Sequence, residues 1–318
     1  MNGWIILDKP LGLGSTQAVG AVKRVCREAG LGKVKVGHGG TLDPLASGVL
    51  PIALGEATKL CGRMLDASKI YAFTIAFGTE TDGLDAEGEV VATSDVRPTL
   101  AEVEAVLPRF TGPIEQVPPA YSAIKIDGQR AYDLARKGEV VEMKARSVTI
   151  FSLRHAGLDP AFIAAPAEWT PDQVRGDEDG QERLDSVTLI AHVSKGTYIR
   201  SLARDIAHAV GTVGHVTMLR RTKAGPFDLE QAISLDKLNA FGQGAAQSEV
   251  ILPLEAGLVD IPALNLSPEA AGAIRQGRVW TGVATDDGLY WGRDDQNRPI
   301  ALIEALAGTL KVMRGFNL

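Results

Sequence analysis

Short apolar segments joined by short connections are the feature that most limits the fold of this chain. Trp4 to Leu7, Lys69 to Phe77 and Val187 to Val193 are rich in aromatic and β-branched residues, which predicts strands. These segments do not alternate regularly with helical ones, as they would in a doubly wound βαβ fold. We therefore expect an α+β fold with a mixed, largely antiparallel sheet flanked by helices.

Helices are predicted at three places. Ser15 or Thr16 can cap the first, because a side-chain oxygen there would accept a bond from a free backbone N–H. Thr99 followed by Glu102 has the pattern of a capping box before the second. The third runs from Tyr198 to Val210, where apolar residues recur at helical spacing.

Residues 37–48, GHGGTLDPLASG, place one acid, Asp43, among residues that control the backbone. Glycines let a chain pass close to a bulky ligand or take positive φ, while Pro44 disfavours the α region at Asp43. A carboxylate held in an open loop could serve as a nucleophile or general base. It could equally cap the next segment in an Asp-Pro turn.

Composition indicates a soluble globular protein. The length of 318 residues suggests two domains, and a hydrophobic content of 45% is ordinary. No apolar run is long enough to cross a bilayer and residues 1–9 do not resemble a signal peptide, so we expect a cytoplasmic protein. Cys26 and Cys61 lack CxxC or Cys/His spacing, which predicts buried thiols rather than a disulfide or a metal site.

Charge is distributed unevenly along the chain. The net charge is −6, and residues 156–188, with eight acids and two bases, carry the same −6. Residues 1–60 and residues 189–240 each have seven bases and four acids, a net +3. These two segments could form a basic patch for RNA, whose binding would then weaken as salt rises.

Several blocks of sequence resemble one family. Residues 37–48 are similar to the catalytic motif GHTGTLDPLATG of the TruB family of tRNA pseudouridine-55 synthases, with departures only at Gly39 and Ser47. Further family blocks follow in order: GWIILDKPLG (3–12), PIALGEATK (51–59), KIYAFTIAFG (69–78), PAYSAIK (119–125), KGTYIRSLARD (195–205) and HVTMLRRT (215–222). The resemblance covers about the first three quarters of the chain and pauses at residues 156–185.

The resemblance implies a pseudouridine synthase fold and an isomerase. Such an enzyme converts uridine in the T-loop of tRNA, at position 55, by breaking the bond from C1′ to N1 and joining C1′ to C5. It implies no cofactor and no metal. The expected partner is the T-arm of tRNA, bound by a monomer without attachment to a membrane.

The resemblance also implies roles for three catalytic residues. Asp43 matches the nucleophile, and whether it attacks the base or the sugar stays open. Tyr71 matches a tyrosine that stacks on the target base, although a tyrosine in a strand can simply belong to the core. Arg200 matches an arginine that pairs with the catalytic aspartate, although an arginine on a helix is usually solvated.

Five residues match positions near the RNA. His38 would fill the space left by the flipped nucleotide, and Leu219 would pack beside the active site. Lys9 could support the catalytic loop, meet a phosphate, or be a solvated surface lysine. Arg220 and Arg221 are either phosphate contacts or members of structural ion pairs.

Two boundaries follow from these patterns. We place a catalytic domain at residues 1–250, with an acidic insertion at about residues 156–185, which is either an interaction loop or a solvated insertion without a partner. Residues 260–318 contain short apolar segments separated by Gly, Asp and Asn, and resemble the PUA-type domain of the family as a small all-β, barrel-like unit.

Two other functions remain open at this point. The first is an RNA-binding or RNA-folding module whose catalysis is secondary or lost. The second is an enzyme that uses the glycine-rich loop for a nucleotide, although this loop lacks the Gly-Lys-Ser/Thr ending that would hold phosphate and magnesium.

Overall fold

The structure, a computed structural model, describes most of the chain. The described residues are 1–122, 124–126, 128–135, 143–157, 174–176, 182–244, 246 and 249–318. The chain divides into two compact units, residues 1–66 with 223–318, and residues 67–222. The predicted boundary near residue 250 stays a prediction.

The acidic insertion is described only in part. Residues 158–173 and 177–181 lie outside the described residues. Between and after them, β11 (Val174–Gly176) and β12 (Glu182–Leu184) pair as an antiparallel ladder.

The unit of residues 67–222 is built on a sheet with the strand order β14, β4, β13, β10, β7. These strands span Gly214–Ala224, Lys69–Phe77, Ser186–Val193, Arg146–His155 and Gly112–Gln116. The last four in that order pair antiparallel with their neighbours. The predicted antiparallel character is therefore confirmed for this part of the sheet.

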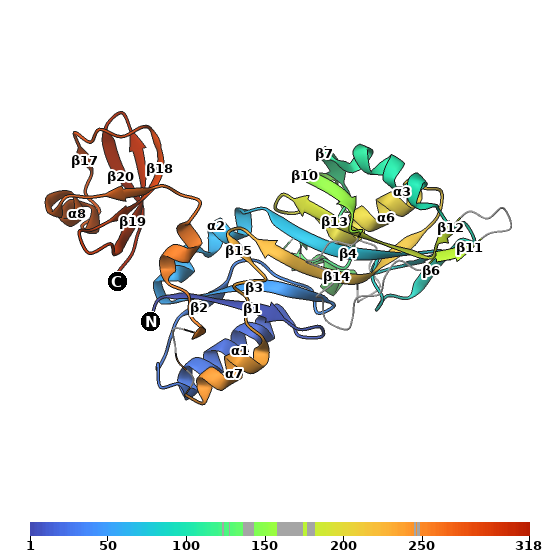
Figure 1. Cartoon of the computed structure of the whole chain (residues 1–318), viewed down its shortest axis with the longest axis horizontal. Coiled ribbons are helices and arrows are strands. Elements are labelled where there is room, and N and C mark those ends of the chain that lie inside the picture. Colours follow the sequence, from blue (N-terminus) through green and yellow to red (C-terminus); the bar gives the residue numbers. More distant parts are fainter. Residues whose placement is uncertain are drawn as a thin grey trace. The chain divides into compact units, whose positions relative to one another are not determined.

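Two helices cover one face of this sheet. Figure 1 shows α3 (Leu100–Val106) and α6 (Ile199–Ala209) lying along the same side of β4 and β13. Alternate residues of the strands, among them Phe73 and Leu189, pack against α6 in one buried cluster. Each large apolar side chain contributes about 1.5–3 kcal/mol on burial, so this core holds α6 against the sheet.

Smaller elements complete this unit. One hairpin is formed by β5 (Thr79–Thr81) and β6 (Val90–Thr93). A second is formed by β8 (Lys125–Ile126) and β9 (Gln129–Arg130), and α4 (Ala131–Ala135) follows it.

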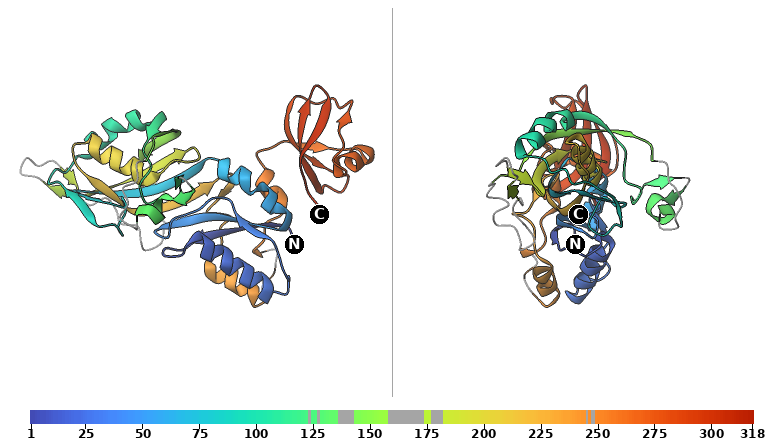
Figure 2. Two further views of the ribbon diagram at one scale, coloured as in Figure 1. Left: turned by 180° about the vertical axis from the view of Figure 1, so that it is seen from behind. Right: turned by 90° about the vertical axis from the view of Figure 1, so that its right-hand side faces the viewer.

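The other unit begins with the long strand pair β1 (Gly3–Lys9) and β3 (Ala46–Leu54), and β2 (Val36–His38) also pairs with β3. Helices α1 (Ser15–Glu28) and α7 (Leu235–Gly242) lie side by side in both Figure 1 and Figure 2. This unit also contains α2 (Cys61–Asp66), β15 (Phe227–Asp228) and the 3-10 helices Gly55–Leu60 and Leu254–Leu258. A further 3-10 helix, Leu107–Phe110, belongs to the unit of residues 67–222.

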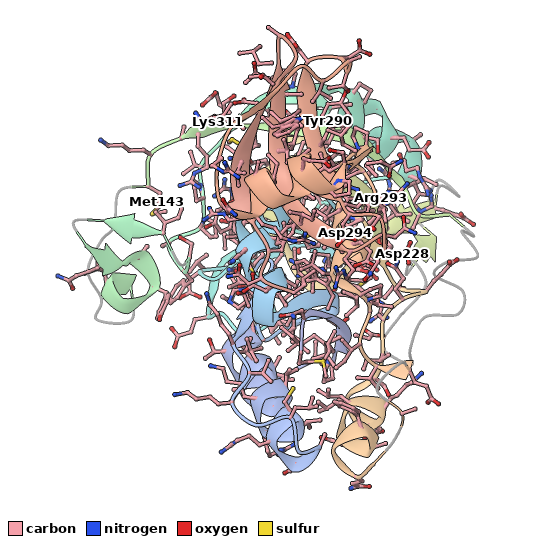
Figure 3. All side chains as sticks on the ribbon, turned by 90° about the vertical axis from the view of Figure 1, so that its left-hand side faces the viewer. Met143, Asp228, Tyr290, Arg293, Asp294 and Lys311 are labelled. Carbon is pink, nitrogen blue, oxygen red and sulfur yellow. The ribbon has the colours of Figure 1, made fainter. Side chains whose placement is uncertain are left out.

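Residues 263–315 form a curled five-stranded sheet with the order β16, β18, β19, β20, β17. The strands span Ala263–Asn265, Gly288–Arg293, Pro299–Leu306, Thr309–Gly315 and Trp280–Thr281. Tyr290 and Lys311 mark β18 and β20 in Figure 3. This half-barrel is consistent with a PUA-like domain.

The prediction of an all-β unit here was wrong in one respect. Helix α8 (Pro268–Arg275) packs its alanines and Ile274 into the core of the C-terminal sheet. Ser267 caps this helix, since its hydroxyl accepts from the Ala270 N–H at 3.2 Å, and Pro268 stands in the first turn. Ser-Pro before an apolar run is a helix-start signal that the strand-like segments around it obscured.

Most of the predicted elements are confirmed. The strands at residues 4–7, 69–77 and 187–193 are present as β1, β4 and β13, and Thr99 and Glu102 form the expected capping box. The predicted cap of the first helix was wrong, because Gly14 is the cap residue and Ser15 lies in the first turn. Cys26 is buried as predicted, whereas Cys61 is half-buried, and burial raises the pKa of both thiols.

No helix among the described residues is long and apolar enough to cross a membrane.

Asp294 makes the stability of the C-terminal sheet depend on pH. Burial alone raises the pKa of this carboxyl group, but hydrogen bonds from Arg298, Arg275 and the Gln296 N–H outweigh burial and lower the pKa to about 2. Its guanidinium partners stand 2.6 Å and 2.9 Å away. Because the folded-state pKa lies below the unfolded value, the carboxylate stabilises the fold above about pH 4, and this stabilisation is lost as the pH falls towards 2.

Asp294→Asn is therefore expected to lower the free energy of unfolding at pH 7 by roughly 1.5–3 kcal/mol, the usual contribution of hydrogen bonds to a charged group. The deficit should shrink as the pH approaches 3, where the wild-type carboxylate begins to be protonated. Chemical unfolding of the wild type and of Asp294→Asn at pH 7 and pH 3 measures this difference in the free energy of unfolding. A deficit of the same size at both pH values would contradict this account of Asp294.

Candidate active site

Asp43 lies in the loop between β2 and β3, and its side chain is exposed. The backbone on both sides of it is held in place. Ser15 Oγ bonds both the N–H and the carbonyl of Leu42, each at 2.8 Å, and the Pro44 carbonyl accepts from the Gly12 N–H at 2.8 Å. The loop thus presents a carboxylate to solvent from a fixed backbone.

Lys9 is one of the groups that hold this loop. The residue is 0% exposed, and its ammonium donates to the carbonyls of Leu13 at 2.7 Å, Pro10 at 3.0 Å and Pro44 at 3.4 Å. A buried ammonium is tolerated only with such partners. The alternative of a solvated surface lysine is therefore wrong. Support of the loop is what these contacts provide, and a phosphate contact, which would require Lys9 to leave them, stays a prediction.

His38 ends β2 and is half-buried. Its Nδ1 accepts from the Gly40 N–H at 3.3 Å, and Gly40 has φ 129°, a value that favours glycine. This bond folds the chain back immediately after His38 and orients the imidazole. The contact of His38 with RNA stays a prediction.

Gly39, where the family motif has threonine, packs against Met64 of α2. A Cβ at position 39 would lie 2.5 Å from Met64 Cβ and 3.1 Å from Met64 Cγ. Met64 is 1% exposed and belongs to the core beneath the loop. The Met64 side chain therefore occupies the space that a side chain at residue 39 would need.

Gly39→Ala is expected to destabilise the protein by about 1–3 kcal/mol, because overpacking forces Met64 or the loop to shift. Gly62→Ala is the matched control, since Gly62 lies in α2, the helix that contains Met64, and a Cβ at residue 62 would meet nothing within 4 Å. The control should be neutral or slightly stabilising. Thermal unfolding of both variants measures the difference, and equal effects would show that the contact with Met64 is not tight.

Tyr71 and Leu219 lie at the edge of the core of the unit of residues 67–222. Tyr71 lies on β4 opposite Ala191 of β13, and Leu219 lies on β14, the strand next to β4. Both side chains are partly buried against the same cluster. Each therefore keeps some surface on which a base could stack, and neither is an ordinary fully buried core residue. Their roles towards RNA stay predictions.

Arg200 is buried at the start of α6, with 8% of its surface exposed, so the alternative of a solvated arginine is wrong. Its Nη1 donates to the Gly83 carbonyl at 2.8 Å and forms an ion pair with Asp85 Oδ2 at 2.9 Å. Its Nη2 donates to the Tyr121 carbonyl at 2.9 Å. One planar guanidinium thus joins three segments of the unit. The pairing of Arg200 with Asp43 stays a prediction.

Arg220 and Arg221 differ in their surroundings although they are neighbours on β14. Arg220 is half-buried, whereas Arg221 is 1% exposed. A guanidinium buried to that degree requires partners inside the protein, which favours the structural alternative for Arg221. Whether either arginine meets a phosphate stays a prediction.

Sequence patterns missed three residues that shape these surroundings. Asp85 is the acidic partner of Arg200, Tyr121 supplies a carbonyl to it, and Ser15 fixes the loop of Asp43. Asp85 lies 115 residues from Arg200 in sequence, so no local pattern could pair them. The sequence pattern at Ser15 predicts a helix cap rather than a contact with this loop.

The described groups offer acid–base and nucleophilic chemistry. An exposed carboxylate can attack an electrophilic carbon or remove a proton, and a tyrosine ring can stack on a base. Among the residues that the structure describes, no three His, Cys, Asp or Glu side chains are grouped so that they could hold a metal ion.

Comparisons with known proteins place these residues in context. Residues 27–199 match the model of the TruB family pseudouridylate synthase (N terminal domain), and residues 200–259 match that of the tRNA pseudouridylate synthase B C-terminal domain. The chain is 67% identical over 318 residues to tRNA pseudouridine synthase B of Novosphingobium aromaticivorans, covering 100% of this chain and 98% of that protein. It is 56% identical over 317 residues to tRNA pseudouridine synthase B of Zymomonas mobilis, covering 100% and 96%.

The fold has a counterpart among solved structures. A chain in the structure of an H/ACA RNP bound to a substrate RNA containing 2'-deoxyuridine matches with a TM-score of 0.69. The match covers 99% of this chain and 85% of that chain at 23% identity. At this identity the match shows the fold, which is that of the pseudouridine synthases, as expected from the sequence.

Proposed function

Because the chain belongs to the TruB family of pseudouridylate synthases, we propose that it isomerises the T-loop uridine of tRNA to pseudouridine with Asp43 as its nucleophile. The enzyme breaks the bond from C1′ to N1, lets the uracil turn, and joins C1′ to C5. The observation that carries the residue assignment is the exposed carboxylate of Asp43 on a backbone held at Leu42 and Pro44.

The other residues take roles that agree with their positions. Tyr71 stacks on the target base, and Leu219 packs beside it, since both are only partly buried at the edge of one core. Arg200 orients Asp43, and Asp85 in turn orients Arg200. His38 fills the space vacated by the flipped nucleotide, and Arg220 contributes to phosphate binding.

Flipping the uridine costs a few kcal/mol, which contacts to the base and to the vacated space must offset. A carboxylate carried on a held backbone reduces the entropy lost in reaching the reactive geometry. Lys9 contributes to this rigidity through its bond to the Pro44 carbonyl, directly after Asp43.

The domain organisation is proposed on similar grounds. Residues 1–250 form the catalytic domain, and residues 260–318 form a PUA-like domain with a core of its own, built from α8 and the C-terminal sheet. The enzyme works as a monomer in the cytoplasm and recognises the T-arm.

Site-specific mapping of pseudouridine tests this function. An unmodified tRNA transcript and an isolated T-arm stem-loop are incubated with the enzyme, and pseudouridine is located by carbodiimide labelling and primer extension. One modified nucleotide, in the T-loop of both RNAs, is expected. Modification of the full tRNA alone would contradict recognition through the T-arm, and modification elsewhere would contradict the substrate assignment.

A further inference from the structure

Ser122 carries a buried hydroxyl without a hydrogen bond to any residue that the structure describes. The residue is 4% exposed, and its Oγ has no hydrogen-bond partner within the described part of the chain. Its backbone is satisfied, because its N–H donates to the Ala120 carbonyl at 2.9 Å and its carbonyl accepts from the Tyr132 N–H at 3.0 Å. An unpaired buried hydroxyl costs about 1–3 kcal/mol, so its presence calls for an explanation.

The neighbouring polar groups are paired. Ser201, on α6 beside Arg200, is 0% exposed, and its hydroxyl donates to the Val117 carbonyl at 2.8 Å. The Gln116 side chain bonds both the N–H and the carbonyl of Tyr198, at 2.8 Å and 3.1 Å. Ser122 therefore differs from Ser201 and Gln116, whose side chains are hydrogen-bonded within the protein.

Ser122 also lies next to the guanidinium of Arg200. The preceding residue, Tyr121, accepts from Arg200 Nη2 at 2.9 Å, and consecutive Cα atoms are about 3.8 Å apart. The backbone that carries the hydroxyl is held in place, since the bond from the Tyr132 N–H to the Ser122 carbonyl is accompanied by one from the Ala131 N–H to the Ile124 carbonyl at 2.7 Å. A group fixed before binding loses little entropy when a ligand reaches it.

We propose that Ser122 Oγ contacts the substrate and hydrogen-bonds the polar edge of the flipped uracil, an inference that rests on the proposed function. Uracil presents carbonyl acceptors and one N3–H donor, and a hydroxyl can serve either kind. A flipped base enters the protein, which agrees with a hydroxyl that is almost fully buried.

Ser122→Ala and the matched Ser201→Ala separate this role from a structural one. Ser122→Ala removes an unpaired group, so its thermal stability should equal or exceed that of the wild type, while kcat/KM on unmodified tRNA falls roughly threefold to tenfold. Ser201→Ala removes a paired hydroxyl and should lower stability. A loss of stability in Ser122→Ala equal to that in Ser201→Ala, or an unchanged kcat/KM beside an active wild type, would overturn the proposal.

Binding measurements show whether the base is the partner. In an Asp43→Asn background, which keeps the uridine unconverted, Ser122→Ala should weaken binding of tRNA by roughly threefold to tenfold. On a tRNA with an abasic nucleotide at the target position the effect should vanish. Equal weakening on both RNAs would reject the uracil contact. An inactive wild type would contradict the proposed function, while this binding cycle would still decide the contact.

Discussion

Asp43→Asn is expected to abolish formation of pseudouridine while tRNA binding stays within about tenfold of the wild type. Asparagine keeps the shape of the side chain but is not a nucleophile, and one exposed charge is a small part of an RNA interface. The backbone bonds at Leu42 and Pro44 do not involve the Asp43 side chain, so the loop should keep its conformation. End-point analysis of modified tRNA and filter binding measure the two effects.

The control for this prediction is Asp228→Asn. Asp228 lies in β15, opposite Lys223 near the end of β14. Asp228 caps the following turn through the Glu230 N–H at 3.0 Å and has no role in the proposed chemistry. Its turnover should stay close to that of the wild type. Turnover by Asp43→Asn at a similar level would remove Asp43 from the role of nucleophile.

Arg200→Met is expected to lower both stability and turnover. The change leaves the Asp85 carboxylate, whose side chain is 17% exposed, without its cation, and breaking such a pair costs about 3–5 kcal/mol. The carbonyls of Gly83 and Tyr121 also lose a donor. Displacement of groups around the reacting base should reduce turnover by at least about a hundredfold.

A second variant keeps this prediction decisive if Arg200→Met does not fold. Arg200→Lys retains the charge, but an ammonium cannot reproduce the planar fork that serves three acceptors at once. It should fold with a smaller loss of stability and still lose most of its turnover. Arg204→Met is the matched control on the same helix, because Arg204 is partly exposed, pairs with its sequence neighbour Asp205 at 2.7 Å and bonds the Val117 carbonyl at 3.4 Å. Wild-type turnover in Arg200→Lys would contradict the positioning role.

The elements predicted from sequence were those with strong local signals. β4 matches the predicted Lys69 to Phe77 because aromatic and β-branched residues fill it and Gly78 ends it. The capping box at Thr99 formed because its two hydrogen bonds connect residues only three apart. Local chemistry is sufficient for such features, and tertiary packing had no reason to override it.

The parts that sequence could not supply depend on distant contacts. Lysine is usually a surface residue, and the burial of Lys9 becomes acceptable only when the fold brings carbonyls from residues 10, 13 and 44 to its ammonium. Asp85 becomes the partner of Arg200 only when the hairpin of β5 and β6 meets α6. The family motif marked Asp43, Tyr71 and Arg200, but the groups that orient them emerge from the folded chain.

Release of tritium from uridine labelled at C5 in an unmodified tRNA transcript tests the central claim most directly. Joining C1′ to C5 displaces the hydrogen at C5, so each conversion frees one label. We expect the wild type to release one equivalent per tRNA and Asp43→Asn to release none while still binding the transcript. No release by a folded, tRNA-binding wild type would contradict the isomerase and leave an RNA-binding or RNA-folding module as the better account.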